Sequence, residues 1–387
     1  MTEPSVRFRR DDGSEYPSWS IVSVGEVVEK QAIPVNVHPD KYYREIGIRS
    51  HGKGLFHKEP VQGIELGNKR VFEIVPNCLV VNIVFAWERA VSKTTADEIG
   101  MIASHRFPMY KPKEGVLDLD YIVRYLITDK GKQLLELASP GGAGRNRTLG
   151  QKEFANSKLS LPCYEEQKKI AKLLVDLDEV ISVTEDEVTN LETQKKAIVR
   201  KLFSQEVRFT KKNGEAFPDW EECRIRDCLS YEQPGKYIVH SDSYDDSFDT
   251  PVLTANKGFI LGYTNESDGH YTKGDVIIYD DFTMDMKYVS FEFKVKSSAI
   301  KMLTSKTDDI NLYFMYGLLQ SKALHQETHT RSYISIVEPM LIEIPCSEEQ
   351  YLIASFLSDF DESISAAKRE LELWRELKAG LLQQMFV

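Results

Sequence analysis

The sequence predicts an α+β protein in which one frame occurs twice, each copy a globular domain of helices and strands followed by a long helix. Two internal matches and one apolar pattern support this prediction. The first match repeats a Val-Arg-Phe motif that leads to a Gly and then to Pro-x-Trp, at a constant offset of 201 residues. The second match repeats a Pro-Cys-x-Glu-Glu-Gln motif and the helix after it, at an offset of 183 residues. Such self-similarity indicates a duplicated unit.

The first match joins residues 6–8 to residues 207–209 and ends at Trp19 and Trp220. Between these points each copy carries a Gly followed by an aromatic residue and Pro, which is typical of a tight turn leaving a short strand. The Trp that follows is expected to anchor the turn. We therefore predict the same local structure at the start of each half of the chain.

The second match predicts two long helices that pair with each other. Their apolar positions alternate in steps of four and three, which is a heptad seam. Lys195 and Lys378 interrupt the seam at equivalent positions, and a lysine there can fix register and orientation. We expect antiparallel pairing within one chain. The principal seam residues are Ile170, Leu174, Leu177, Ile181 and Leu191 in the first helix and Ile353, Leu357, Phe360, Ile364 and Trp374 in the second.

These features divide the chain into four segments. They are a first insert over 1–160, a helix over 161–205, a second insert over 206–343 and a helix over 344–387. About 37 helical residues at 1.5 Å each predict a rod of roughly 55 Å, long enough to act as a spacer. Because the second helix ends where the frame would begin again, the two ends of the chain are expected to lie close together, with a pseudo-twofold axis relating the halves.

Composition excludes several classes of protein. The 387 residues are 42% hydrophobic and 28% charged, which is typical of a folded globular protein. The most apolar run is about half the ~20 residues that a spanning helix requires, and the first residues lead us to expect no secretory signal. The five cysteines include no Cys-x-x-Cys pair, which argues against a disulfide framework. We expect a cytoplasmic protein that does not contact membranes.

Charge is distributed unevenly between the inserts. The net charge is −11. Residues 1–150 hold 21 Lys and Arg against 19 Asp and Glu, a balance of +2, whereas residues 206–340 hold 15 against 22, a balance of −7. A domain that binds nucleic acid usually carries a basic excess. If the second insert binds DNA, its cations must gather on one face, and the expected members are Lys257, Lys287, Lys294, Lys296 and Arg331.

With these motifs in place, the sequence resembles the DNA-specificity (S) subunits of Type I restriction-modification systems over nearly its whole length. Besides the two helix openings, the matching pieces are residues 49–55, 86–91, 104–107, 251–255, 260–263, 279–283 and 296–299. The resemblance implies two target-recognition domains, each reading one half of a bipartite, asymmetric site in double-stranded DNA. It also implies that the helices dock methyltransferase (modification) subunits and that the assembly recruits restriction subunits.

The resemblance further implies a non-catalytic chain with no metal and no cofactor of its own. S-adenosylmethionine, Mg and ATP would reside on the partner subunits. Arginine, lysine, asparagine and glutamine are the side chains that bond purine edges in the major groove. The expected DNA-binding residues are Arg49, Lys53, Lys58, Arg145, Asn146 and Arg147 in the first insert, and Asn256, Lys257, Lys296, Arg331 and Tyr333 in the second.

Two alternatives from other classes remain open at this point. Asp281, Glu292 and Lys294 imitate the acidic pair and lysine of Mg-dependent nucleases, although the alternation of apolar and charged residues around Lys294 also fits a half-buried strand. The second alternative is a non-catalytic coiled-coil scaffold. Residues 47–53 fit part of a phosphate-binding loop, but Gly54 stands where that motif needs Ser or Thr.

Overall fold

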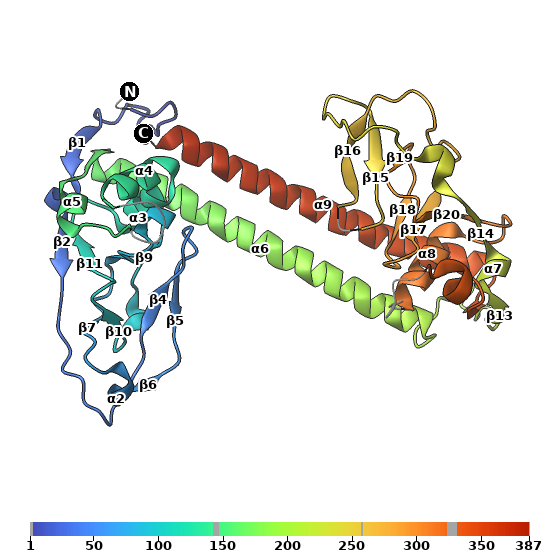
Figure 1. Cartoon of the computed structure of the whole chain (residues 1–387), viewed down its shortest axis with the longest axis horizontal. Coiled ribbons are helices and arrows are strands. Elements are labelled where there is room, and N and C mark those ends of the chain that lie inside the picture. Colours follow the sequence, from blue (N-terminus) through green and yellow to red (C-terminus); the bar gives the residue numbers. More distant parts are fainter. Residues whose placement is uncertain (1–2, 142–146, 257, 323–330, 387) are drawn as a thin grey trace. The chain divides into compact units, whose positions relative to one another are not determined.

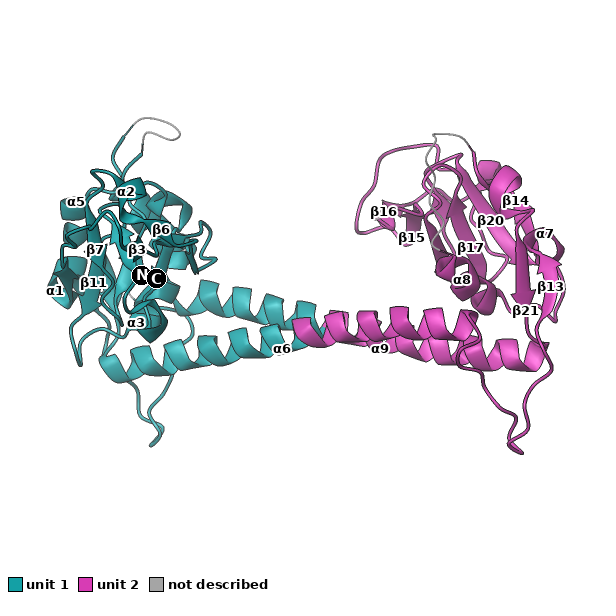
Figure 2. Ribbon diagram, turned by 90° about the horizontal axis from the view of Figure 1, so that it is seen from below, with its two compact units in different colours: residues 1–184, 370–387 teal, residues 185–369 magenta. Residues whose placement is uncertain are grey.

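The computed structural model describes residues 3–141, 147–256, 258–322 and 331–386. The chain divides into two compact units, unit 1 with residues 1–184 and 370–387, and unit 2 with residues 185–369 (Figure 2). Each unit contains helices and β-strands, which confirms the α+β prediction (Figure 1). The boundaries fall inside the two long helices, so each unit holds one globular domain and part of both helices.

Unit 1 is built around an antiparallel four-stranded sheet in the order β2-β11-β8-β9. Helix α3 packs on β8 and β9, and its buried Tyr121 and Ile122 join the main core of the unit. The strands are β1 (Ser20–Ser23), β2 (Val28–Gln31), β3 (Tyr42–Tyr43), β4 (Ile46–Ile48), β5 (Leu55–His57), β6 (Val61–Gln62), β7 (Val71–Glu73), β8 (Leu79–Val81), β9 (Val91–Lys93), β10 (Ile102–Ser104), β11 (Met109–Pro112) and β12 (Lys158–Leu161). The α-helices are α1 (Val24–Val27), α2 (Gly63–Leu66), α3 (Leu119–Ile127), α4 (Asp129–Leu137), α5 (Gln151–Asn156) and the start of α6 (Tyr164–Phe203).

Unit 2 is built around an antiparallel four-stranded sheet in the order β14-β20-β17-β18. All five residues of β17 are buried, as expected for an apolar strand inside a sheet that is covered on both faces. The strands are β13 (Glu221–Arg224), β14 (Leu229–Glu232), β15 (Thr250–Leu253), β16 (Ile260–Thr264), β17 (Val276–Asp280), β18 (Met286–Val289), β19 (Lys294–Val295), β20 (Ile300–Ser305) and β21 (Leu341–Ile344). The α-helices are α7 (Ile225–Cys228), α8 (Leu312–Ser321), the second part of α6 and the first part of α9 (Ser347–Met385).

The two units share one frame. In unit 1, β1 pairs with β12 just before α6, and in unit 2, β13 pairs with β21 just before α9. Each opening strand leads into a one-turn helix and a second strand that joins the four-stranded sheet. The repeated motifs of the sequence therefore become repeated structure, whereas the segments between them fold differently.

The Arg of the first motif bonds the second Glu of the other motif. The Arg7 guanidinium donates to Glu166 from Nε at 3.0 Å and from Nη2 at 2.8 Å, and the Glu166 side chain is 0% exposed. Trp19 Nε1 donates to the same carboxylate at 3.2 Å. In unit 2, Arg208 makes the equivalent bonds to the buried Glu349 at 3.2 and 2.8 Å. Two motifs that lie far apart in sequence thus form one anchor in each unit.

The Gln of the repeated motif ties each long helix to its globular domain. Gln167 accepts from the backbone N–H of Asp118 at 2.8 Å, at the start of α3, and donates to the carbonyl of Pro162 at 2.9 Å. Gln350 repeats both bonds, accepting from Asn311 at the start of α8 at 2.9 Å and donating to Pro345 at 2.9 Å. Because both amides are buried, these bonds satisfy polar groups that would otherwise be costly.

Matched ion pairs join α6 and α9 within each unit, and in unit 2 the pairs of Lys195 with Asp361 and of Lys368 with Glu192 show that the two helices run antiparallel. In unit 1, Lys378 donates to Asp178, and in unit 2, Lys195 donates to Asp361 at 2.6 and 2.7 Å. The two lysines that interrupt the heptad seam therefore have carboxylate partners on the opposite helix. Arg124 of α3 also donates to Asp178 at 2.5 Å, and Tyr313 of α8 donates to Asp361 at 2.5 Å. Each aspartate thus joins a domain helix to both long helices.

The seam residues do not all serve helix pairing. Ile170, Leu174 and Leu177 belong to the main core of unit 1, and Ile353 and Leu357 to that of unit 2, because the first turns of each long helix pack into a globular domain. The remaining seam residues follow further along each helix, where Ile364 is buried and the others are half-buried: Ile181, Leu191, Phe360 and Trp374.

The two ends of the chain meet in unit 1, as predicted (Figure 1). The backbone N–H of Val6 donates to the carbonyl of Gln384 at 3.3 Å. The ring of Phe386 packs against those of Tyr121 and Tyr125, with centroids 5.4 and 6.0 Å apart. The last turn of α9 therefore completes the core that the first insert begins.

Candidate nucleic-acid interface

In unit 1, the predicted residues Arg49 and Lys53 lie on the hairpin of β4 and β5. Both side chains are exposed. The Arg49 guanidinium lies 4.8 Å from the Phe56 ring centroid, and its Nη1 donates to the carbonyl of Leu55 at 3.4 Å, so two contacts fix its direction. Gly52 and Gly54 have positive φ angles of 67° and 79°, so the turn needs these glycines. The segment is a strand-turn-strand, which rules out the phosphate-binding loop that its glycines imitate.

The tip of this hairpin is held by backbone bonds to the loop before β9. The N–H groups of His51 and Gly52 donate to the carbonyls of Glu88 and Arg89 at 2.7 and 3.0 Å. Ser50 Oγ also donates to Glu88 at 2.7 Å. These bonds hold the backbone of the hairpin in place, so its exposed side chains have defined positions from which they can contact base edges.

The other predicted residues of unit 1 differ in availability. Lys58 pairs with the buried carboxylate of Glu45 at 3.4 Å, a carboxylate that Lys69 also binds at 3.1 Å. Lys58 therefore balances a buried charge in the domain. The Arg147 guanidinium lies 6.0 Å from the Trp87 ring centroid. Arg145 and Asn146 lie outside the described residues.

In unit 2, Asn256 and Arg331 are exposed. The Asn256 side-chain oxygen accepts from Thr283 Oγ1 at 3.1 Å, which connects the tip of the β15–β16 hairpin to the turn between β17 and β18. The amide nitrogen of Asn256 remains available as a donor among the described residues. Lys257 lies outside the described residues.

Two predicted residues of unit 2 are occupied within the fold. Tyr333 is 0% exposed and packs between the rings of Tyr231 and Tyr279, so the expectation that it contacts a base is corrected: it is a core residue. Lys296 forms an ion pair with Asp242. The apolar environment of the Tyr333 hydroxyl raises the pKa of that group.

The residues of the nuclease alternative do not form a metal site. Asp281 is buried, pairs with Lys301 at 3.2 Å and accepts from the Tyr333 backbone N–H at 2.9 Å. Lys294 is also buried and pairs with Glu266 at 2.6 Å, whereas Glu292 is exposed. The alternation of residues 291–296 predicted a half-buried strand with Lys294 on its exposed face. The strand is present as β19, but Lys294 is buried, so that part of the prediction is wrong.

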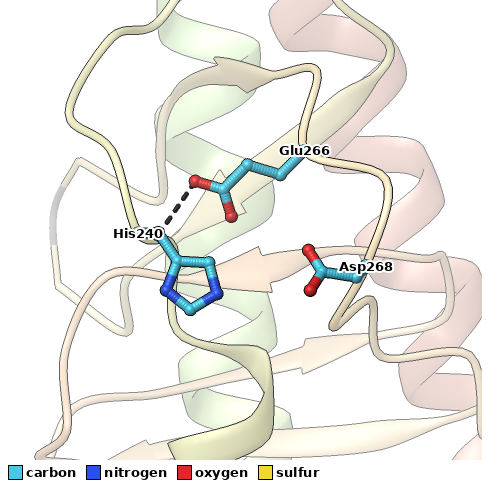
Figure 3. Close-up of side chains that lie close together, drawn as sticks. All are labelled: His240, Glu266 and Asp268. Atoms are coloured by element: carbon cyan, nitrogen blue, oxygen red, sulfur yellow. Dashed lines mark hydrogen bonds between the residues drawn. The ribbon is translucent and has the colours of Figure 1, made fainter.

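Sequence reasoning missed a cluster formed by His240, Glu266 and Asp268 (Figure 3). Ligand atoms of the three lie within 4.8 Å of one another, a spacing that suits a metal ion. Glu266 is already engaged, however: one oxygen accepts from the His240 and Ser241 N–H groups at 2.9 and 3.0 Å, and the other pairs with buried Lys294. Glu266 therefore neutralises the buried Lys294, and no sequence motif signals this cluster.

Two globular domains, each anchored in the same way to a pair of long helices, define a class of duplicated two-domain proteins. Comparison with known families identifies the family within this class. The chain matches the family described as Type I restriction modification DNA specificity domain over residues 80–193 and 218–373. The match covers more than half of the chain, and its two segments fall on the two halves of the repeat. The chain belongs to this family.

Individual relatives are similar over different lengths. The specificity subunit of a type I restriction enzyme from Escherichia coli is 48% identical over 130 residues, which is 32% of each chain. Another from Methanocaldococcus jannaschii is 24% identical over 97% of this chain and 94% of its own. Among solved structures, a Type-I restriction-modification S subunit from M. genitalium is 13% identical with a TM-score of 0.66, covering 100% of this chain and 99% of its own.

A second solved structure has the same fold. The HsdS subunit from Thermoanaerobacter tengcongensis is 16% identical with a TM-score of 0.52, and the alignment covers 100% of this chain and 99% of that one. At these identities the likeness shows the fold alone. In the part of the chain that the structure describes, no helix is long and apolar enough to cross a membrane.

Proposed function

We propose that this chain is the sequence-reading subunit of a DNA-methylating restriction-modification complex, in which each globular domain recognises one half of a bipartite, asymmetric DNA site. One contrast carries the proposal. The same anchors, Arg to buried Glu and Gln to a domain helix, hold both domains to the long helices, whereas the exposed hairpins differ. A constant frame with two different exposed loops fits a protein that reads two different sequences.

The chemistry of the exposed loops supports base contacts. Arg49 and Lys53 on one hairpin are donors suited to guanine O6 and N7, and Asn256 on the other is suited to adenine. Backbone hydrogen bonds hold the hairpin of Arg49 and Lys53, and a side-chain bond from Thr283 holds Asn256, so little order has to be gained on binding. We propose these three as base-reading residues and assign Arg147 and Arg331 to the surrounding backbone contacts.

The chain is proposed to act in the cytoplasm, where its DNA is, and to catalyse nothing itself. Methyl transfer from S-adenosylmethionine, and any cleavage that needs Mg and ATP, would occur on partner subunits. The carboxylates of the buried Asp281 and the half-buried Glu266 support this assignment, since both are bound to lysines and neither is free to hold a catalytic ion.

The long helices are the proposed docking surface for the methyltransferase subunits, with restriction subunits joining the assembled complex. The helical part of unit 1 exposes Val183, Leu373 and Leu377, with exposed fractions of 61%, 65% and 46%. Large apolar side chains that gather on an exposed surface are typical of protein interaction sites. Replacing Leu373 with Glu should therefore weaken methyltransferase binding without changing the DNA sequence that is read.

The function is tested by co-expressing the chain with its methyltransferase and mapping N6-methyladenine in the host DNA. A split, asymmetric methylated motif is expected. Arg49→Ala should relax one position in one half-site and Asn256→Ala one position in the other half-site, each lost base contact costing about 1–3 kcal/mol. Lys212→Ala, a change at an exposed lysine that belongs to neither hairpin, is the control.

Three results would contradict the proposal. An intact complex that methylates no motif would favour the scaffold alternative. A relaxation of both half-sites by a single substitution would show that the domains do not read separately. Metal-dependent cleavage of DNA by the pure chain would restore the nuclease alternative.

A further inference from the structure

The negative net charge of the second insert opposes binding to DNA, and few of the cations expected to offset it lack a carboxylate partner. Lys294 is buried against Glu266, and Lys296 is paired with Asp242. Among the expected cations that the structure describes, only Lys287 and Arg331 have no carboxylate partner. A domain with a charge of −7 that keeps only two of these expected cations unpaired, among the described residues, is a poor ligand for a polyanion.

The structure places additional cations beside this domain, on helix α6. A groove of about 770 Å³ lies within unit 2, lined by α6, α9, the end of α8 and the start of β18. Five cationic and three acidic side chains line it. Two of the cations are neutralised inside the groove, Lys195 by Asp361 and Lys368 by Glu192.

The three remaining cations are Lys196, Arg200 and Lys287. None of them has a carboxylate partner among the described residues, and Lys196 and Arg200 are exposed. The only acidic side chain of the groove without a cationic partner there is Asp285. The groove therefore keeps a net positive charge on a surface where α6 and the globular domain meet, although that domain is acidic.

The repeat shows that this charge is specific to one half of the molecule. Residues 194–203 of α6 carry four Lys and Arg and no acidic residue. The equivalent residues 377–386 of α9 carry only Lys378. At the positions of Lys196 and Arg200 the second copy has Ala379 and Gln383. The helix is thus basic beside the acidic domain and nearly neutral beside the domain whose own balance is +2.

We infer that this groove binds the sugar-phosphate backbone of the DNA next to the half-site that unit 2 reads. The phosphates would lie against Lys196, Arg200 and Lys287, so the helix supplies the cations that the second domain lacks. Base contacts would remain with the exposed hairpin of that domain. The inference rests on the proposed function, and it assigns DNA binding to a helix segment that also belongs to the spacer.

The test measures how the DNA affinity of the assembled complex depends on salt. Each phosphate contact contributes about 0.9 to the slope of log K against log salt concentration. The variant Lys196→Gln with Arg200→Gln and Lys287→Gln should therefore lower that slope by roughly 2–3 and weaken binding to a duplex that carries the methylated motif. The motif itself, mapped by sequencing, should stay unchanged because phosphate contacts carry no sequence information.

A matched control removes the same charge elsewhere. Lys130, Lys152 and Lys212 are exposed and do not line the groove. Their triple replacement with Gln should leave the slope within about 1 of the wild-type value, by the same contribution per contact.

Three outcomes would overturn the inference. In the first, the groove variant keeps the wild-type slope. In the second, it loses a methyltransferase subunit by native mass spectrometry, which would make the groove a protein interface. In the third, it changes the methylated motif, which would assign base contacts to these residues. Failure of the proposed function is distinguishable, since the wild-type complex would then methylate no motif.

Discussion

Replacing Arg7 with Met should destabilise unit 1 by about 3 kcal/mol. Among the described residues, the Glu166 carboxylate accepts three side-chain hydrogen bonds: two from Arg7 at 3.0 and 2.8 Å and one from Trp19 at 3.2 Å. Removing one partner of a buried ion pair costs about 3–5 kcal/mol, because an uncompensated charge stays buried. We take the lower end because the Arg7 side chain is 20% exposed and water can reach the vacated space.

Hydrogen exchange followed by mass spectrometry measures this loss within one unit. A loss of about 3 kcal/mol speeds exchange through opening of the core by roughly 100-fold, since 1.4 kcal/mol is a factor of ten. The effect should appear in the first turns of α6, which carry Glu166. Arg208→Met should give the same change in the first turns of α9, where its partner Glu349 lies, and serves as the control for location.

A double variant tests the reasoning itself. With Arg7→Met and Glu166→Met together, no unpaired charge remains, so most of the lost stability should return. If exchange in Arg7→Met is less than about threefold faster than in the wild type, the loss of stability is under 1 kcal/mol, and the estimate of about 3 kcal/mol is refuted. A double variant as labile as the single one would show that packing by Arg7, and not its charge, holds the turn.

Four further predictions concern other parts of the fold. Burial raises the pKa of Glu266, but bonds from Lys294 and two backbone amides lower it to about 2 from 4.5. Its contribution to stability is therefore complete above pH 4.5 and lost as the pH falls toward 2, and Glu266→Gln should flatten acid unfolding curves in that interval. Gly317→Ala should cost about 1–3 kcal/mol in urea unfolding, because its Cβ would lie 2.9 Å from a leucine of α9. Gly380→Ala, with open space around it, should gain up to about 1 kcal/mol. Asp361→Asn should cost about 1–2 kcal/mol in unit 2 by removing a charged hydrogen bond between the long helices.

The repeat and the helices could be predicted because they are properties of the sequence along one dimension. The two offsets located α6 and α9 to within a few residues, and the heptad spacing predicted that they pair. The closeness of the chain ends followed from the order of the repeated motifs and is confirmed by the bond between Val6 and Gln384. Periodicity and self-similarity need no knowledge of the contacts that form later.

The candidate site could be predicted only in part. Arg49, Lys53 and Asn256 lie on exposed hairpins, as expected of residues next to Gly-rich turns. Tyr333 and Lys296 looked equally available in sequence, yet one is buried among aromatic rings and the other is paired with a carboxylate 54 residues away. Composition and spacing cannot distinguish a free polar residue from one whose partner is distant in sequence.

What the sequence determined by itself is therefore the frame: two copies, two long helices and the residue types at each repeated motif. What only the tertiary structure decided is which charges neutralise one another. Lys294, Lys301 and the seam lysines all counted as cations in the sequence, but each has a carboxylate partner from another segment, whereas Lys196 and Arg200 of the helix do not. The physical reason is that apolar periodicity is a property of residues close together in sequence on one helix or strand. The free-energy cost of burying a charged side chain instead depends on every group that folding brings next to it.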